Sequence, residues 1–107
     1  MNEDPESDQR QEALRVVRHR GALAEMVEVM STQYGRAVIH RIISATGLFT
    51  DLMRSTDRDT AFALGRREVG LPIFAAIHEA CPELYATMLR EAQHRQITED
   101  AQDAASA

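Results

Sequence analysis

The fold class is decided by residues 61–85, which read AFALGRREVGLPIFAAIHEACPELY. At 3.6 residues per turn, the apolar side chains of this stretch fall on two stripes. One stripe holds Phe62, Val69, Ile73, Ala76, Ile77 and Ala80, and the other holds Leu64, Leu71, Phe74 and His78. Because a helix with two apolar sides packs in the middle of a protein, we predict a central helix over about residues 57–80. Cys81-Pro82 ends it, since the residue before a proline avoids helical geometry.

Two glycines and a proline are expected to shape this central helix. Gly65 and Gly70 carry no side chain, so a neighbouring backbone is expected to approach the helix closely at both positions. Pro72 has no N–H and cannot donate to the carbonyl of Glu68, which predicts a kink near Gly70.

Three further helices fit the apolar pattern around this stretch. The first covers about Asp8 to Met30, and Arg20-Gly21 lies in the middle of its apolar stripe. We expect a bend or a break there because glycine weakens a helix; the alternative is a continuous helix in which Arg20 is partly covered and paired. The second begins after the cap Ser31-Thr32 and ends at Gly47, and the fourth runs from Pro82 to about residue 96.

Charge and composition complete the expected architecture. The 107 residues carry a net charge of −5, and acidic residues concentrate in the first and last twelve positions. No stretch of useful length alternates apolar and polar residues, so strands are not expected. We predict a single all-α domain over residues 13–95, a bundle of about four helices around the kinked central helix. Acidic flexible tails are expected over residues 1–12 and 96–107, and residues 50–56 form a loop in which Leu52 and Met53 pack onto the body.

The arginines stand out among the candidate functional residues. All twelve basic residues are Arg, which is consistent with codon bias or with a need for bidentate contacts. Arg36 lies in the first turn of its helix, where the helix dipole disfavours a cation, and Arg66 and Arg67 border the two stripes of the central helix. We predict that Arg36 or Arg66 pairs with an acid or a buried carbonyl across helices. The structural or partner-binding candidates are Arg36, Gly65, Arg66, Arg67, Gly70 and Tyr85.

The sequence contains few of the residue patterns that enzyme active sites and metal sites require. A single Glu-x-x-His pair, Glu91 and His94, falls short of the duplicated motif that a di-iron bundle needs, and Cys81 is expected to be a buried small side chain. No nucleophile elbow or phosphate-binding glycine loop is present. We therefore expect no enzyme activity, no metal and no cofactor. Nucleic-acid binding is disfavoured by a pI near 5.3 and the absence of Lys.

Two blocks of residues resemble a small helical family of tailed phages and prophages. They are Gly35 to Ile43 with Gly47-Leu48-Phe49, then Ala61-Phe62, Gly65-Arg66-Arg67, Val69-Gly70, Pro82-Glu83-Leu84-Tyr85, Met88 and Glu91-Ala92. The resemblance covers about residues 30–93. The family is encoded among the virion genes, beside capsid and portal genes, in podophages of the Bordetella type, and it carries no established activity to transfer.

Residue chemistry and resemblance together predict a non-enzymatic virion-associated or assembly protein that acts through helix contacts. The expected partners are other phage structural proteins or a second copy of the chain. The alternatives are an accessory protein that contacts nucleic acid during packaging or regulation, and a host-interaction factor. An acidic N-terminus and a single cysteine predict synthesis in the host cytoplasm, with the virion as the later location, and no apolar run is long enough to span a membrane.

Overall fold

The computed structural model describes residues 4–48 and 57–106, and the side chains of residues 57–60 are left aside. These ranges form four helices and contain no strand. The helices are α1 (Pro5–Met30), α2 (Gln33–Ala45), α3 (Asp57–Ala80) and α4 (Pro82–Ser106). The all-α prediction is therefore confirmed. The spacing Thr56-Asp57-Arg58-Asp59 predicts Thr56 as the cap of α3. Thr56 and the loop residues Leu52 and Met53 lie outside the described residues.

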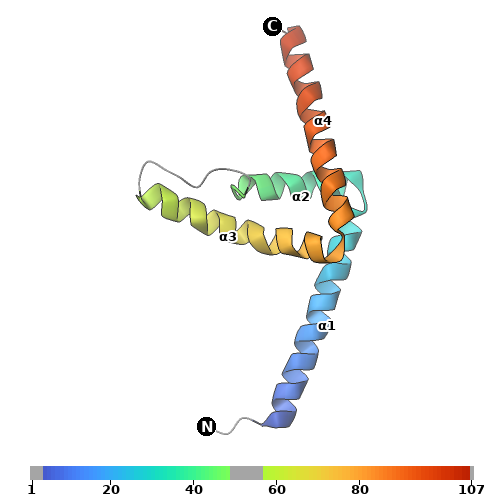
Figure 1. The fold of residues 1–107 in the computed structure, drawn as a ribbon, viewed down its shortest axis with the longest axis vertical. Helices are drawn as coiled ribbons and strands as arrows, with labels where there is room; N and C mark the ends of the chain where they lie inside the picture. The colour runs from blue at the N-terminus through green and yellow to red at the C-terminus, as the bar shows by residue number, and fades with distance from the viewer. Residues whose placement is uncertain (1–3, 49–56, 107) are drawn as a thin grey trace.

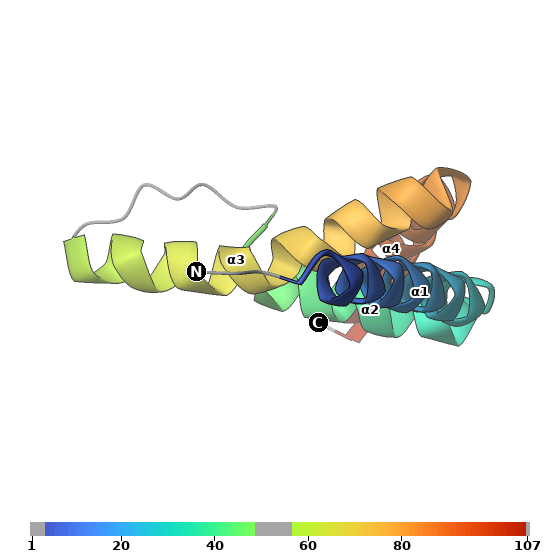
Figure 2. The ribbon, with the colours of Figure 1, turned by 90° about the horizontal axis from the view of Figure 1, so that it is seen from below.

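The four helices meet at one place, which we call the helix junction: the ends of α1 and α3 and the starts of α2 and α4 (Figure 1). From the junction α1 and α4 extend in opposite directions, and the two termini lie at opposite ends of the molecule (Figure 1). α2 and α3 lie side by side and project to one side. Figure 2 shows that α3 changes direction along its length between its yellow and orange parts, and Pro72, on which the predicted kink near Gly70 is based, lies inside this helix.

The molecule is long and flat. Its Cα atoms span 70 × 39 × 16 Å, and its radius of gyration is 19.1 Å. A compact domain of this length has a radius of gyration of about 13 Å. The arms formed by α1 and α4 therefore lie largely outside any shared core.

Capping side chains fix the helix starts. The carboxylate of Asp4 accepts the N–H of Glu6 at 3.1 Å and begins α1, with Pro5 at the first helical position. The hydroxyl of Thr32 accepts the N–H of Gly35 at 3.0 Å and begins α2, as predicted. Gly47 has a φ of 75° just past α2, which is the left-handed conformation expected there.

Several predicted helix limits are wrong. α1 is continuous through Arg20-Gly21, because one exposed glycine costs only about 1 kcal/mol in a long helix. Residues 5–12 are helical rather than an irregular tail, since the Asp4 cap and the acidic first turn suit the helix dipole. α4 likewise runs to Ser106, through the expected tail at 96–107. Alanines favour a helix there, and a side-chain bond of 3.0 Å from Gln96 to Asp100 joins consecutive turns.

One small core holds the junction together. We call it the junction core, and it comprises Met30, Ile39, Ile43, Ile77, Cys81 and Met88. Leu48, Ile73, Leu84 and Tyr85 pack against it from its edge. α3 is buried along one face only, at Ala63, Gly70 and Ile77. The two apolar stripes predicted for the central helix are therefore only partly covered, because the flat arrangement places no helix on either flank of its first half.

Candidate functional site

Arg36 connects three helices at the junction. Its Nε donates to one carboxylate oxygen of Glu91 at 2.6 Å, and a terminal nitrogen donates to the other oxygen at 3.2 Å. The second terminal nitrogen donates to the carbonyl of Met30 at 2.8 Å. That carbonyl belongs to the last turn of α1, where no intrahelical partner is available. The predicted cross-helix role of Arg36 is confirmed, and its position in the first turn of α2 is explained by these contacts.

The Arg36–Glu91 pair is partly shielded from water. The two side chains are only 13% and 20% exposed. The hydrogen bond from Arg36 lowers the pKa of Glu91 below its ordinary value, and burial opposes this effect. The same hydrogen bond raises the pKa of Arg36. Both groups therefore stay charged at neutral pH, as a bidentate pair requires. The sequence marked Arg36 by its unfavourable place near the helix dipole, but gave no signal that Glu91 was its partner.

Gly70 lies where α3 crosses the end of α2. A Cβ atom at this position would overlap the hydroxyl of Thr46 and lie 3.0 Å from the Cβ of Thr46. Thr46 is buried, and its hydroxyl donates to the carbonyl of Ile43. A neighbouring element therefore approaches Gly70 closely, but the approaching atoms belong to the side chain of Thr46 and not, as predicted, to a backbone. At Gly65 no neighbouring element among the described residues comes within 4 Å of the position that its Cβ would take.

Tyr85 helps to join α3 to α4. Its ring packs edge-on against Phe74 with centroids 5.4 Å apart, and 4.5 Å from the ring of His78. Phe74 and His78 are themselves 4.1 Å apart, and Nδ1 of His78 donates to the carbonyl of Phe74 at 2.9 Å. Tyr85 is half-buried in this cluster. Its role in the chain is therefore structural.

Arg66 and Arg67 lie away from the junction, on the first half of α3. The guanidinium of Arg66 stands 5.2 Å from the centre of the Phe62 ring, a cation–π contact within one helix. Arg66 is exposed and Arg67 is half-buried. The six predicted candidates therefore do not form one site. Arg36 and Tyr85 hold the junction, Gly70 sits at the α2–α3 contact, and Gly65 and Arg66 lie on the free surface of α3.

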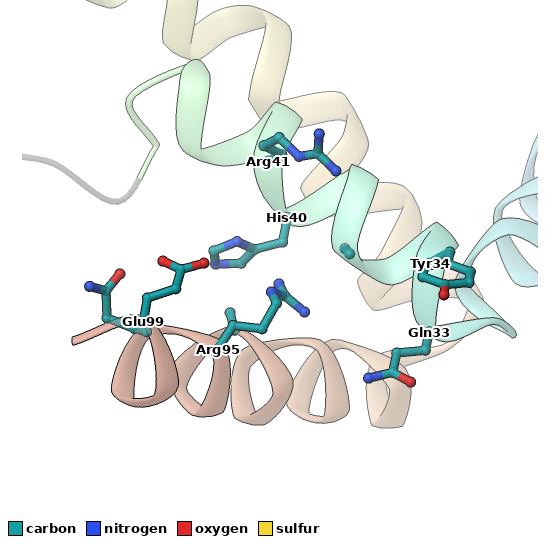
Figure 3. A pocket seen from close by; sticks show the side chains of 9 residues that line it. Gln33, Tyr34, His40, Arg41, Arg95 and Glu99 are labelled. Atoms are coloured by element: carbon teal, nitrogen blue, oxygen red, sulfur yellow. The ribbon is translucent and has the colours of Figure 1, made fainter. Parts of the chain in front are cut away.

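A groove of about 630 Å³ runs between α2 and α4 (Figure 3). Its polar lining includes His40 and Arg41 from α2 and Arg95 and Glu99 from α4. In Figure 3 the carboxylate of Glu99 points toward the ring of His40, and Arg95 lies on the α4 side. Partial burial lowers the pKa of His40, and the positive charge of Arg95 lowers it further. This open and mixed-charge groove was not predicted from the sequence.

Two classes of site are not found in the part of the chain that the structure describes. No group of three His, Cys, Asp or Glu side chains lies close enough to hold a metal ion. No helix among residues 4–48 and 57–106 is long and apolar enough to cross a membrane. Cys81 is buried in the junction core, and burial raises the pKa of its thiol. A raised pKa makes the thiol a poor nucleophile.

Exposed apolar side chains lie along residues 62–71 of α3. On one flank are Phe62 and Val69, and on the other are Leu64 and Leu71. We call these two flanks the α3 face. Both predicted stripes are represented in it, since the buried side of the helix runs between them through Ala63 and Gly70.

A model of a known protein family matches this sequence. The model of the Bbp19-like phage protein family matches residues 26–90, which is more than half of the chain. The chain belongs to the Bbp19-like phage protein family. No curated protein and no solved structure matches it.

The part of this Bbp19-like protein that matches the family model has a clear structural meaning. It begins at Met26, near the end of α1, and ends at Arg90, in the third turn of α4. It therefore contains the whole junction core and the α3 face, and it stops one residue before Glu91. Most of α1 and the outer part of α4 lie outside it. The predicted relationship to a phage family is confirmed.

Proposed function

We propose that this Bbp19-like protein is a non-enzymatic virion-associated or assembly protein that binds other phage structural proteins through the α3 face. The observation that carries the proposal is the exposure of that face within the segment that matches the family model. Phe62 is 69% exposed and Val69 is 62% exposed, on a helix that is buried at Ala63 and Gly70 between its two flanks. Phe62 and Val69 are seven residues apart and form one exposed apolar flank of α3, and exposed apolar patches on a folded protein mark interaction sites.

Charge and sequence context support a protein partner over a nucleic acid. The chain has a net charge of −5, and a phosphate backbone would be repelled by an acidic protein unless a strongly basic surface compensated. On the α3 face Arg66 covers part of the Phe62 ring, so the surface is amphipathic rather than uniformly basic. The resemblance to a family encoded beside capsid and portal genes, in podophages of the Bordetella type, favours particle components as the partners.

A pair of matched substitutions tests the α3 face. Val69→Glu places a charge on the face, and Ile97→Glu places the same charge on α4, outside the segment that matches the family model. Ile97 is 60% exposed, so neither change disturbs buried packing in the single chain. Each variant is tagged and recovered from cells in which the phage grows, and co-purified phage proteins are identified by mass spectrometry.

We expect the natural chain and Ile97→Glu to recover the same phage structural proteins, and Val69→Glu to lose them while keeping its helical circular dichroism spectrum. Equal recovery by all three proteins would contradict the role of the α3 face. Recovery of DNA with salt-sensitive gel-shift activity, and of no structural protein, would instead favour the nucleic-acid alternative.

A further inference from the structure

α2 and α3 form an antiparallel pair whose buried residues face each other. α2 runs away from the helix junction, and α3 runs back toward it (Figure 1). Gly70 of α3 meets Thr46 at the end of α2, and Ile77 shares the junction core with Ile43. Because both helices are right-handed and run in opposite directions, residues one position before a buried residue lie on the same side of the pair in both helices. Residues one position after a buried residue lie on the other side.

α4 covers one of these two sides. His40 comes one residue after the buried Ile39 and lines the groove between α2 and α4. His78 comes one residue after the buried Ile77, and its ring packs against Tyr85 of α4. Two residues that follow buried positions on different helices therefore face the same third helix, as the antiparallel geometry requires.

The other side of the pair is exposed and apolar, and we call it the open side. On α2, Val38 and Ile42 each come one residue before a buried isoleucine, and they are 45% and 40% exposed. On α3, Phe62 and Val69 each come one residue before a buried small residue, and both are more exposed than the two α2 side chains. Ile73, one turn after Val69, is half-buried. The open side therefore combines side chains of two helices.

The open side is a strip rather than a round patch. It extends from Val38 to the Gly70–Thr46 contact along α2, and from that contact to Phe62 along α3, which is eight residues on each helix. At 1.5 Å per residue the strip is about 24 Å long, which corresponds to about four turns of an α-helix. A strip of this length fits the apolar face of one amphipathic helix.

Arg66 gives the open side its charge. It lies between Phe62 and Val69 in the sequence, it is exposed, and its guanidinium contacts the Phe62 ring. No ion pair joins it to an acid among the described residues. A second copy of the chain that packed its own open side here would bring another Arg66 and no carboxylate to this place. Charge complementarity therefore favours a different, acidic partner.

We propose that the open side binds an acidic amphipathic helix of another phage structural protein, with a carboxylate of that helix paired to Arg66. The inference rests on the proposed function and deepens it. It selects the flank of the α3 face that contains Phe62 and Val69, adds α2 to the binding surface, and leaves the flank of Leu64 and Leu71 free. An arginine and an aromatic ring among apolar side chains are typical of the residues that dominate binding at protein interfaces.

Val38→Glu and Leu64→Glu test which side of the pair binds. Val38 is on the open side and 45% exposed, and Leu64 is on the other side and 46% exposed, so the same charge is placed at matched exposure. The tagged chains are recovered from cells in which the phage grows. We expect Val38→Glu to lose the phage structural protein that the natural chain recovers, and Leu64→Glu to keep it, while both retain a helical circular dichroism spectrum.

The outcomes separate this inference from the proposed function. If Val69→Glu loses the partner but Val38→Glu keeps it, the proposed function stands and the two-helix surface is refuted. Loss of the partner by both Val38→Glu and Leu64→Glu would also overturn the choice of side. If the natural chain recovers no phage structural protein, the inference and the proposed function both fail.

Cross-linking tests the carboxylate that pairs with Arg66. The chain contains no lysine, so Arg66→Lys introduces a single lysine amine, which a carbodiimide joins directly to a carboxylate in contact with it. Arg41→Lys is the control, because Arg41 is exposed and lines the groove between α2 and α4. We expect Arg66→Lys, and not Arg41→Lys, to be joined to an Asp or Glu in a helix of the recovered phage protein. Recovery of the partner by Arg66→Lys without this cross-link, or equal cross-linking by both variants, would overturn the acidic contact.

Discussion

Two glycines five residues apart in α3 are expected to respond in opposite ways to the same substitution. Gly70 meets the side chain of Thr46, and Gly65 faces open space among the described residues. Alanine in place of glycine in a helix interior stabilises the helix by about 1 kcal/mol. At Gly65 this gain is unopposed, so Gly65→Ala is expected to raise the free energy of unfolding by about 0.5–1 kcal/mol.

At Gly70 the new methyl group must displace the hydroxyl, Cβ and Cγ2 of Thr46, and the last of these atoms would be 3.3 Å from it. Forcing an extra methyl group into a packed contact costs about 1–3 kcal/mol. Because Thr46 is buried and its hydroxyl is bonded to the carbonyl of Ile43, it cannot simply rotate away. The cost offsets or exceeds the helix gain. We therefore expect Gly70→Ala to be less stable than Gly65→Ala by about 1–3 kcal/mol.

Urea unfolding followed by far-UV circular dichroism measures this difference, with all proteins at one concentration so that any self-association affects them equally. In a Thr46→Ala background, which removes the hydroxyl and Cγ2, the penalty of Gly70→Ala should shrink. The reasoning is refuted if Gly70→Ala is as stable as Gly65→Ala, or if Thr46→Ala leaves the difference between them unchanged.

The remaining predictions concern the charged groups. Because Glu91 has a lowered pKa in the folded chain, its stabilising effect is present above the ordinary value of 4.5 and is lost as the pH falls through the lowered pKa. Glu91→Gln should thus be less stable than the natural chain at pH 7, and the gap measured by thermal unfolding should close in acid. Arg36→Lys should recover only part of the stability lost in Arg36→Ala, since an ammonium cannot reproduce the bidentate contact. The pKa of His40 should lie below 6.5, and Arg95→Gln should raise it in an NMR titration.

Periodicity was sufficient to predict four helices, but not which of their faces would be covered. The spacing of Val38, Ile39, Ile42 and Ile43 predicts an apolar side for α2, and Ile39 and Ile43 enter the junction core. The same kind of pattern on α3 leaves Phe62 and Val69 exposed. An apolar periodicity identifies which side of a helix is hydrophobic. It does not show whether the atoms that pack on this side belong to the same chain. That information lies in the arrangement of the helices.

Some features of the structure depend on residues that are adjacent in the sequence, and others depend on residues that are far apart in it. The cap Thr32 and the left-handed Gly47 depend on neighbouring residues, so the sequence identifies both. The contact of Gly70 with Thr46 depends on how two helices cross, and nothing local separates Gly70 from Gly65. The partner of Arg36 is 55 residues away at Glu91, which no short-range rule can select. The outer ends of α1 and α4 are helical although their apolar pattern is weak, so periodicity alone does not identify them.

Whether this Bbp19-like protein joins phage assemblies through the α3 face is tested most directly by its presence in purified particles. Proheads and mature particles are purified from cells in which the phage encodes either the natural chain or Val69→Glu, and the chain is quantified against the capsid protein by mass spectrometry. The account predicts a fixed ratio of the natural chain in at least one of the two fractions, and loss of Val69→Glu from that fraction although it is synthesised and folded. Absence of the natural chain from both fractions, or equal incorporation of Val69→Glu, would contradict it.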